Sequence, residues 1–262
     1  MADDNRASGG GEIRVSREDR VLHLTFASPG RKNALGQAMY LVLRDALNAA
    51  AASPDINVVV LQGADGTFTT GNDAADTTKP PPGEKPGTLQ FIETIAAFPK
   101  PIVAKVDGVA IGLGCTMLLH CDLVYAAENA RFLLPFVNQA LVPEAASTYL
   151  LPRLMGLARA SELVLLGEMF SARVAQDVGL VTAVLSSADL EAHVQARASL
   201  LAAKPRAAVR RAKALLRSVP PGGAMGRIAE ESEAIEACLA GPEFAEMLAA
   251  FRDKRTPDFS KI

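Results

Sequence analysis

Alternating and continuous apolar segments divide the first half of the chain into predicted strands and helices. Residues 13–15 and 21–26 alternate between apolar and polar side chains around Glu18 and Asp19, which predicts a β-hairpin. Three further strands are predicted where β-branched residues run together, as in strands covered on both faces: residues 57–61, 102–106 and 123–126. Helical spacing over residues 37–52 predicts an amphipathic helix whose apolar face consists of Met39, Val42, Leu43, Ala46 and Ala50. Strands that alternate with helices predict an α/β fold.

The chain after about residue 186 is predicted to be entirely helical. Four helices are expected, with breaks at Pro205, Pro220-Pro221 and Gly241-Pro242: residues 190–203, 206–217, 224–239 and 243–251. Residues 77–87 are rich in Pro and Gly, which predicts a mobile surface loop. The polar, Gly-rich start predicts a disordered tail over residues 1–11. We therefore expect a mixed body over residues 12–203 and a helical region over residues 204–262.

Composition and charge narrow the possible classes of function. The 262 residues are 49% hydrophobic and carry a net charge of −2, so the chain can bury a full core but lacks the basic character of nucleic-acid-binding domains. No apolar run reaches the ~20 residues that a membrane-spanning helix needs. Three cysteines without C-x-x-C spacing predict buried reduced thiols and fit a cytoplasmic location. The C-terminal Ser260-Lys261-Ile262 approaches the peroxisomal S-K-L signal, except that Ile replaces Leu.

Several common catalytic motifs are absent from the sequence. There is no G-x-x-x-x-G-K-[ST] phosphate loop, no G-x-G-x-x-G turn after the first strand, and no G-x-S-x-G nucleophile elbow. The three histidines lack metal-ligand spacing, so we expect neither a metal site nor a separate cofactor.

Two Gly-containing turns follow predicted strands, at residues 66–73 and 107–117. The second turn opens an apolar stretch that is predicted to be helical, so its N–H groups would lie at the positive end of a helix dipole. Backbone N–H groups that converge from two turns can form an oxyanion hole, which stabilises negative charge on a carbonyl oxygen. The alternative is that both are ordinary strand-to-helix connections in which Gly supplies a positive φ.

Six segments resemble, in order, the signatures of the crotonase (enoyl-CoA hydratase/isomerase) superfamily. They span nearly the whole chain from about residue 12, and they are R-K-N-A-L (31–35), F-T-T-G-N-D (68–73), K-P-I-V-A-K-V-D-G (100–108), G-L-G-C-T-M-L-L-H-C-D (112–122), F-S-A-R-V-A-Q-D-V-G-L-V-T-A-V (170–184) and A-A-F-R-D-K-R-T-P-D-F (249–259). The resemblance implies the crotonase (ClpP-like) fold, a spiral of β-β-α units with a C-terminal helical trimerisation region. It also implies a homotrimer or dimer of trimers, and an acyl-CoA substrate of which coenzyme A is a part.

The resemblance also assigns binding positions residue by residue. The family's oxyanion donors fall on the backbone N–H groups of Asn72 and Leu113. The CoA- and substrate-binding positions fall on Arg31, Lys32, Ala34, Leu35, Thr70, Gly71, Asp73 and Gly112. Arg31 and Lys32 suit phosphate charge, and a solvated turn is the alternative for both.

Apolar residues near these turns are candidates for an acyl pocket. Met117, Phe132 and Phe136, with Leu113, could line such a pocket or belong to the ordinary core. The loop at 77–87 would lie beside this pocket as a lid. The resemblance alone implies that Phe251 and Lys254 reach CoA, either within one subunit or across a subunit boundary.

The two acid/base positions of the family's hydratases carry other residues here. They fall on Thr116 and Phe136, neither of which can act as a carboxylate. A different carboxylate, Glu144, lies in a P-E-x-x-S turn similar to that of peroxisomal-type Δ3,Δ2-enoyl-CoA isomerases. An isomerase needs one base to move a proton from C2 to C4 of a dienolate, and an apolar pocket suits that base by raising its pKa. We therefore predict that Glu144 is the catalytic residue of an enoyl-CoA isomerase.

Other interpretations of the same residues stay open. Pro143 could be the first residue of a helix whose dipole Glu144 complements. Hydration or another crotonase lyase reaction is an alternative, as is a catalytically silent CoA-binding protein, because both hydratase glutamates are missing. An RNA-binding member of the fold is disfavoured by the acidic balance of charges. Asp73 and Asp122 are expected to tie loops through backbone N–H groups.

Overall fold

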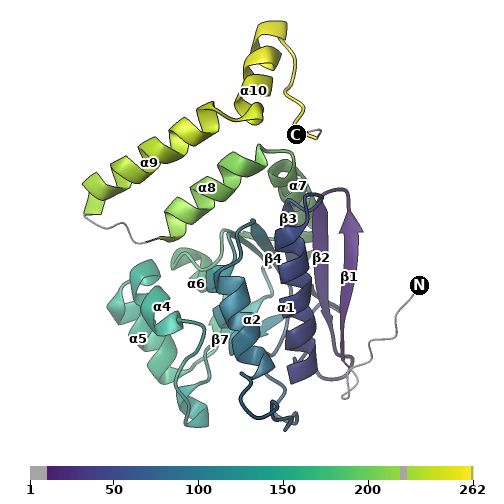
Figure 1. The fold of residues 1–262 in the computed structure, drawn as a ribbon. Coiled ribbons are helices and arrows are strands. Elements are labelled where there is room, and N and C mark those ends of the chain that lie inside the picture. Colours follow the sequence, from purple (N-terminus) through teal and green to yellow (C-terminus); the bar gives the residue numbers. More distant parts are fainter. Residues whose placement is uncertain (1–10, 219–222, 261) are drawn as a thin grey trace.

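A six-stranded sheet with helices on both faces forms the body of the protein (Figure 1). The computed structural model describes residues 11–218, 223–260 and 262, so the tail predicted for residues 1–11 lies, except for Gly11, outside the described residues. The sheet has the order β1-β2-β3-β4-β6-β9. Its strands are β1 (Glu12–Glu18), β2 (Val21–Ala27), β3 (Val58–Gly63), β4 (Ile102–Val106), β6 (Leu123–Ala127) and β9 (Ala183–Leu185).

The predicted hairpin and the three predicted buried strands are confirmed. β1 pairs antiparallel with β2, and every neighbouring pair from β2 to β9 is parallel. Along β3, Val58 and Val60 pack in the cluster that α7 (Ser187–Ala202) completes, whereas Val59 and Leu61 pack in the larger cluster on the other face. Burial on both faces explains why these strands are apolar at every position rather than at alternate ones.

A smaller sheet completes the β structure. Its order is β5-β7-β8, and its strands are β5 (Val109–Ile111), β7 (Arg131–Leu133) and β8 (Phe170–Ser171). In the successive pairs β4–β5 and β6–β7, the first strand belongs to the large sheet and the second to the small one. This repeat corresponds to the β-β units expected for a spiral.

The larger cluster is covered by two helices that lie side by side, α1 (Gln37–Ala52) and α2 (Gly87–Ala96) (Figure 1). The buried residues of α1 are Met39, Tyr40, Leu43, Leu47 and Ala50. Val42 and Ala46, which were predicted on this face, are only half-buried. Tyr40 and Leu47 are buried instead, because α2 packs along α1. The sequence pattern did not reveal α2. The ring of Tyr40 lies against that of Phe91 of α2, with 5.6 Å between the ring centroids.

The loop predicted over 77–87 is confirmed for residues 77–86, which form no helix or strand, and Gly87 already begins α2. The stretch after β5 was predicted as one helix, but it consists of α3 (Leu113–Thr116) followed by the 3₁₀ helix η1 (Met117–His120). Further along the chain come the 3₁₀ helix η2 (Val137–Gln139) and the helices α4 (Ser147–Met155), α5 (Leu157–Leu166) and α6 (Ala172–Asp177).

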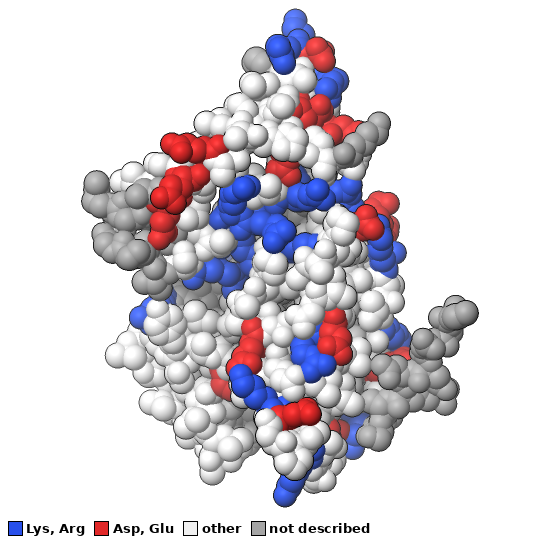
Figure 2. Space-filling model, viewed as in Figure 1, with Lys and Arg blue, Asp and Glu red and all other residues white. Residues whose placement is uncertain are grey.

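The four predicted helices of the last third are confirmed as α7, α8 (Arg206–Arg217), α9 (Gly223–Leu239) and α10 (Pro242–Asp253). α7 begins three residues earlier than predicted because Ser186 caps it: its Oγ accepts a hydrogen bond of 3.2 Å from the N–H of Asp189. α9 and α10 project beyond α8, away from the sheet (Figure 1). Lys and Arg side chains gather along α8, and Asp and Glu side chains gather along α9 (Figure 2). None of the helices in the described part of the chain is long and apolar enough to cross a membrane.

α8 is fixed to the body by a network around Asp122, which we call the α8 anchor. The Nζ of Lys213 donates to Asp122 Oδ2 (2.8 Å) and to the carbonyl of Lys100 (2.6 Å), and Arg217 donates to Asp122 Oδ1 (3.0 Å). Asp122 also accepts from the N–H of Ile102 at 2.8 Å, which confirms that it ties a loop through a backbone N–H. Both carboxylate oxygens of Asp122 are therefore satisfied.

Candidate active site

The two Gly-containing turns lie side by side at one edge of the sheet. Because β3 and β4 are parallel, the segments after Gly63 and Val106 leave the sheet at the same edge, where α/β proteins commonly bind ligands. The N–H of Thr69 donates to Val109 O (2.9 Å), and the N–H of Ile111 donates to Thr69 O (3.0 Å). These backbone hydrogen bonds join the first turn to the second.

Glycine is required where the two turns approach most closely. Gly71 has a φ of +78°, and a Cβ there would lie 2.5 Å from Ile111 O and 3.1 Å from Leu113 N. A Cβ on Gly114 would lie 2.7 Å from Thr69 O. A side chain at either position would force the turns apart, so glycine allows the backbone before Asn72 to pack directly against that of Leu113.

The N–H groups predicted as oxyanion donors are available in this arrangement. Within the described ranges, the N–H groups of Asn72 and Leu113 donate to no protein acceptor. Leu113 opens α3, and the first N–H groups of a helix have no acceptor inside it. Leu35 accepts from the N–H of Asp73 (3.0 Å) and donates to Gly71 O (2.8 Å), so the N–H of Asn72 between them points away from Leu35.

The R-K-N-A-L turn is fastened to the first of these turns. The carbonyl of Lys32 accepts from the N–H of Thr70 at 3.2 Å. Asn33 has a φ of +55°, and its side chain accepts from the N–H of Ser28 (3.0 Å) and donates to Thr67 O (2.6 Å). Sequence analysis gave Asn33 no role, although an Asn in the middle of a turn signals a left-handed residue.

Three of the predicted CoA-binding residues, Arg31, Ala34 and Asp73, help to line a cavity of about 290 Å³ beside this turn. Arg31 is 41% exposed, and its guanidinium donates to Asp73 Oδ2 at 2.5 Å. Asp73 Oδ1 accepts from the N–H of Ala75 (3.0 Å), so its expected tie to a backbone N–H is confirmed. The ion pair with Asp73 neutralises part of the positive charge that Arg31 was predicted to offer to phosphate. Lys32, the other residue predicted to bind phosphate, is exposed.

Glu144 lies in an irregular loop, residues 141–146, that precedes α4. Its buried Oε1 has no hydrogen-bond partner among the residues that the structure describes, and burial raises the pKa of the carboxyl. The carbonyl of Glu144 accepts from the N–H (3.0 Å) and the Oγ (2.6 Å) of Ser147. Since α4 begins at Ser147, Pro143 is not the first residue of a helix, and that explanation for Glu144 is wrong.

The two residues after Glu144 have a strained backbone, and a hydrogen bond from a buried histidine holds one of them in place. Ala145 and Ala146 have φ values of +54° and +53°, a left-handed conformation that costs roughly 1–2 kcal/mol per non-glycine residue. The Nε2 of buried His120 donates to Ala145 O at 2.9 Å, and burial lowers the pKa of His120. Strain of this kind is concentrated at functional sites, where the surrounding structure has to impose it.

Tyr40 is hydrogen-bonded to the first Gly-containing turn and feels the charge of Glu144. Its Oη donates to Asn72 Oδ1 at 2.7 Å. The pKa of Tyr40 is raised well above its ordinary value, first by burial and then by the negative charge of Glu144. The Asn72 side chain and the Glu144 carboxylate therefore both act on the same phenol, although they come from distant parts of the chain.

Comparisons with known proteins show the family to which the chain belongs. The family model "Enoyl-CoA hydratase/isomerase" matches residues 16–261. The chain belongs to the enoyl-CoA hydratase/isomerase family. It is 37% identical over 253 residues to a 2,3-dehydroadipyl-CoA hydratase of Escherichia coli (strain K12), covering 95% of this chain and 98% of the relative. It is 35% identical over 221 residues to enoyl-CoA delta isomerase 2 of Rattus norvegicus, covering 82% of this chain and 56% of the rat protein.

Solved structures of the family share the fold. An enoyl-CoA hydratase from Polaromonas sp. JS666 superposes with a TM-score of 0.86 at 33% identity, covering 95% of this chain and 99% of that one. The predicted crotonase fold class is therefore confirmed.

The two positions that the resemblance assigns to the hydratase glutamates, Thr116 and Phe136, carry side chains without acid/base capacity. Thr116 is buried, and its Oγ1 points back to Gly112 O at 3.4 Å. Phe136 is 6% exposed and belongs to the larger core cluster. Neither side chain can orient a water molecule as a carboxylate would.

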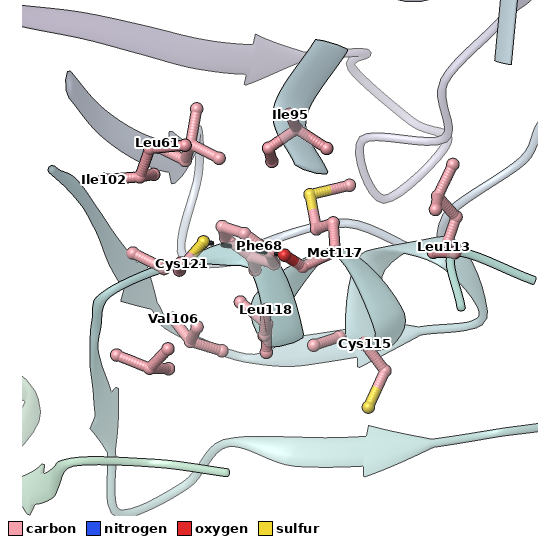
Figure 3. Packing of buried hydrophobic residues seen from close by; sticks show 14 of the residues in the cluster. Leu61, Phe68, Ile95, Ile102, Val106, Leu113, Cys115, Met117, Leu118 and Cys121 are labelled. Atoms are coloured by element: carbon pink, nitrogen blue, oxygen red, sulfur yellow. Dashed lines mark hydrogen bonds between the residues drawn. The ribbon is translucent and has the colours of Figure 1, made fainter. Parts of the chain in front are cut away.

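The predicted acyl-pocket residues lie in the core. Met117 and Phe132 are fully buried, and Met117 points toward Ile95, beside Phe68 (Figure 3). Cys115, near Met117 in the same view, is a buried thiol whose pKa burial raises to about 12. In this structure these side chains form packing rather than an open wall, so their part in an acyl pocket stays a prediction.

Of the two C-terminal residues expected to reach CoA, the structure describes the side chain of Lys254 alone. Lys254 is exposed just after α10, which projects away from the sheet (Figure 1). The side chain of Phe251 lies outside the described part of the chain. A contact of Lys254 with CoA across a subunit boundary stays a prediction.

Proposed function

We propose that this member of the family is a Δ3,Δ2-enoyl-CoA isomerase in which Glu144 is the only catalytic acid/base. The observation that carries the proposal is the partly buried Glu144 carboxyl, whose Oε1 has no partner within the described residues. Burial raises its pKa, which makes the carboxylate a stronger base and the protonated form readily available for returning the proton.

The proposed reaction conserves all atoms of the substrate. The thioester oxygen accepts hydrogen bonds from the N–H groups of Asn72 and Leu113, which stabilise the negative charge that develops there. Glu144 removes a proton from C2, and the electron pair of the C–H bond forms a dienolate. The same carboxyl then returns the proton to C4, so that the C3=C4 double bond becomes a conjugated C2=C3 double bond.

Hydration is the second candidate, because the hydratase relative from Escherichia coli is similar over nearly its whole length. In a hydration reaction Glu144 would have to orient the water and protonate the α-carbon, two tasks that the family's hydratases divide between two glutamates. Thr116 and Phe136 at those positions favour isomerisation, which needs only one base.

We also propose that the helical region carries contacts between subunits of a homotrimer or dimer of trimers. Ile228, Ile235 and Leu239 of α9 are 53%, 57% and 51% exposed, although such side chains favour burial. Light scattering measures the mass of the assembly for the wild-type protein and for an Ile235→Glu variant. We expect the variant to form a smaller assembly.

The enzymatic proposal is tested with a 3-enoyl-CoA substrate, by following the absorbance of the conjugated 2-enoyl thioester. Wild-type protein should turn over, and Glu144→Gln should lose about 10³-fold in kcat. Glu168→Gln is the matched control, since Glu168 is an exposed glutamate outside this loop. Hydration of a 2-enoyl-CoA without isomerisation would replace the proposal with a hydratase, and no turnover of either substrate would indicate a CoA-binding protein.

A further inference from the structure

The hydroxyl of Tyr40 is a polar group in an otherwise apolar environment. Tyr40 is completely buried, and its ring packs against Phe91 of α2. Phenylalanine would fill the same space, so packing explains the ring but not the oxygen. A buried hydroxyl costs free energy unless it is hydrogen-bonded, and this one donates to Asn72 Oδ1 at 2.7 Å.

This hydrogen bond fixes an exposed turn to the core. Asn72 is solvent-exposed, whereas Tyr40 belongs to the rigid helix α1. Since the Oδ1 of Asn72 accepts from the phenol, its amide NH₂ is left as the donor at the exposed edge of the turn. The same bond restrains the backbone N–H of Asn72, which lies only a few bonds away.

The electrostatic surroundings keep Tyr40 in the form that can donate. Burial, followed by the negative charge of Glu144, raises the pKa of the phenol well above its ordinary value. The phenol therefore stays protonated wherever the enzyme is expected to work, and the hydrogen bond to Asn72 persists when Glu144 is ionised.

We propose that Tyr40 is a positioning residue of the thioester site: its hydroxyl holds the Asn72 side chain and so keeps the Asn72 N–H in place as an oxyanion donor. The inference rests on the proposed function only through the oxyanion hole, which serves isomerisation and hydration alike. Tyr40 itself touches neither the substrate nor the transferred proton in this account.

Tyr40→Phe tests the proposal, because it removes one oxygen and leaves the ring. Tyr125→Phe is the matched control, since Tyr125 is 4% exposed and packs against His193 in the cluster on the opposite face of the sheet. We expect Tyr40→Phe to lower kcat by about tenfold, less than the roughly 10²–10³-fold cost of removing an oxyanion donor. KM should stay within about twofold, and Tyr125→Phe should match wild type.

A second readout does not depend on turnover. Acetoacetyl-CoA is an enolisable thioester, and the near-ultraviolet band of its enolate reports how well a site stabilises the negative oxygen. Tyr40→Phe should lower the bound enolate fraction about tenfold, while the Kd for free CoA remains unchanged. This measurement separates the two proposals, because a wild-type protein that forms the enolate but does not isomerise 3-enoyl-CoA refutes only the isomerase.

A double-variant cycle tests whether Tyr40 acts through Asn72. In an Asn72→Ala background, Tyr40→Phe should have no further effect on kcat or on the enolate fraction. Wild-type behaviour of Tyr40→Phe, losses that multiply with those of Asn72→Ala, or a wild-type protein without any bound enolate would each overturn the inference.

Discussion

Two carboxylates in this protein have opposite surroundings. In the α8 anchor, Asp122 accepts hydrogen bonds from Lys213, Arg217 and the N–H of Ile102. In the loop at 141–146, Glu144 has a buried oxygen with no partner in the described chain, next to two alanines with left-handed φ values. The first arrangement lowers the free energy of the folded state, whereas the second raises it and leaves a carboxylate ready for proton transfer. The comparison favours a stabilising role for Asp122, and it fits the catalytic role that we propose for Glu144.

The largest effect on stability is expected at the anchor. Asp122→Asn removes the negative charge that Lys213 and Arg217 share, and it leaves the nearly buried Lys213 ammonium without its counter-ion. The free energy of unfolding should fall by about 3 kcal/mol, measured by urea denaturation. The kcat of the protein that remains folded should stay within about twofold of wild type. A loss of kcat without a loss of stability would mean that Asp122 serves catalysis rather than the stability of the fold.

A smaller loss of stability and a clear loss of activity are expected at His120. His120→Leu keeps the volume of the side chain but removes the donor to Ala145 O. The free energy of unfolding should fall by about 1 kcal/mol, and kcat should fall by about tenfold because the Glu144 loop is no longer held. His120→Gln, which retains a donor, is the matched variant and should recover part of kcat. Equal kcat values for the wild type, His120→Leu and His120→Gln would show that the Glu144 loop does not depend on the hydrogen bond from His120 to Ala145.

The smallest expected effect is a gain of stability. Because the folded-state pKa of Glu144 is raised above 4.5, its contribution to stability is present below about pH 4.5 and is lost as the pH rises through the raised value. Glu144→Gln cannot ionise, so it should have the higher Tm at neutral pH. The difference from wild type should shrink as the pH falls, and thermal melts from pH 4 to pH 8 would measure it. A variant that is less stable at neutral pH would mean that the ionised carboxylate has a partner.

The sequence predicted five of the six strands of the large sheet. Alternation revealed β1 and β2, and the continuous apolar runs that burial on both faces produces revealed β3, β4 and β6. The sequence also located the two Gly-containing turns of the candidate site, since glycine is required where Gly71 and Gly114 meet the facing backbone. The pattern did not reveal α2, which follows a Pro-rich loop and begins at Gly87 without a capping side chain. Local periodicity therefore recovered most of the chain up to β6 and the helices from α7 onward, but none of the elements between β6 and α7.

The connections within the candidate site depend on contacts between distant residues. Tyr40 bonds to Asn72 across 32 positions, and His120 bonds to Ala145 across 25. Helical spacing did not place Tyr40 on the apolar face of its helix, and nothing local shows that its hydroxyl finds a partner. Single-sequence reasoning identified the candidate base but not the groups that hold the site together.

The most direct test of the account is the pH dependence of kcat/KM for a 3-enoyl-CoA, which reports ionisation of the free enzyme. Glu144 must be ionised to remove the C2 proton, and burial raises its pKa above the ordinary 4.5. We expect activity to fall as the pH is lowered through a single ionisation above 4.5, and Asp122→Asn should leave this midpoint unchanged. A midpoint at or below 4.5, or an acid limb that persists in Glu144→Gln, would contradict the assignment of Glu144 as the base.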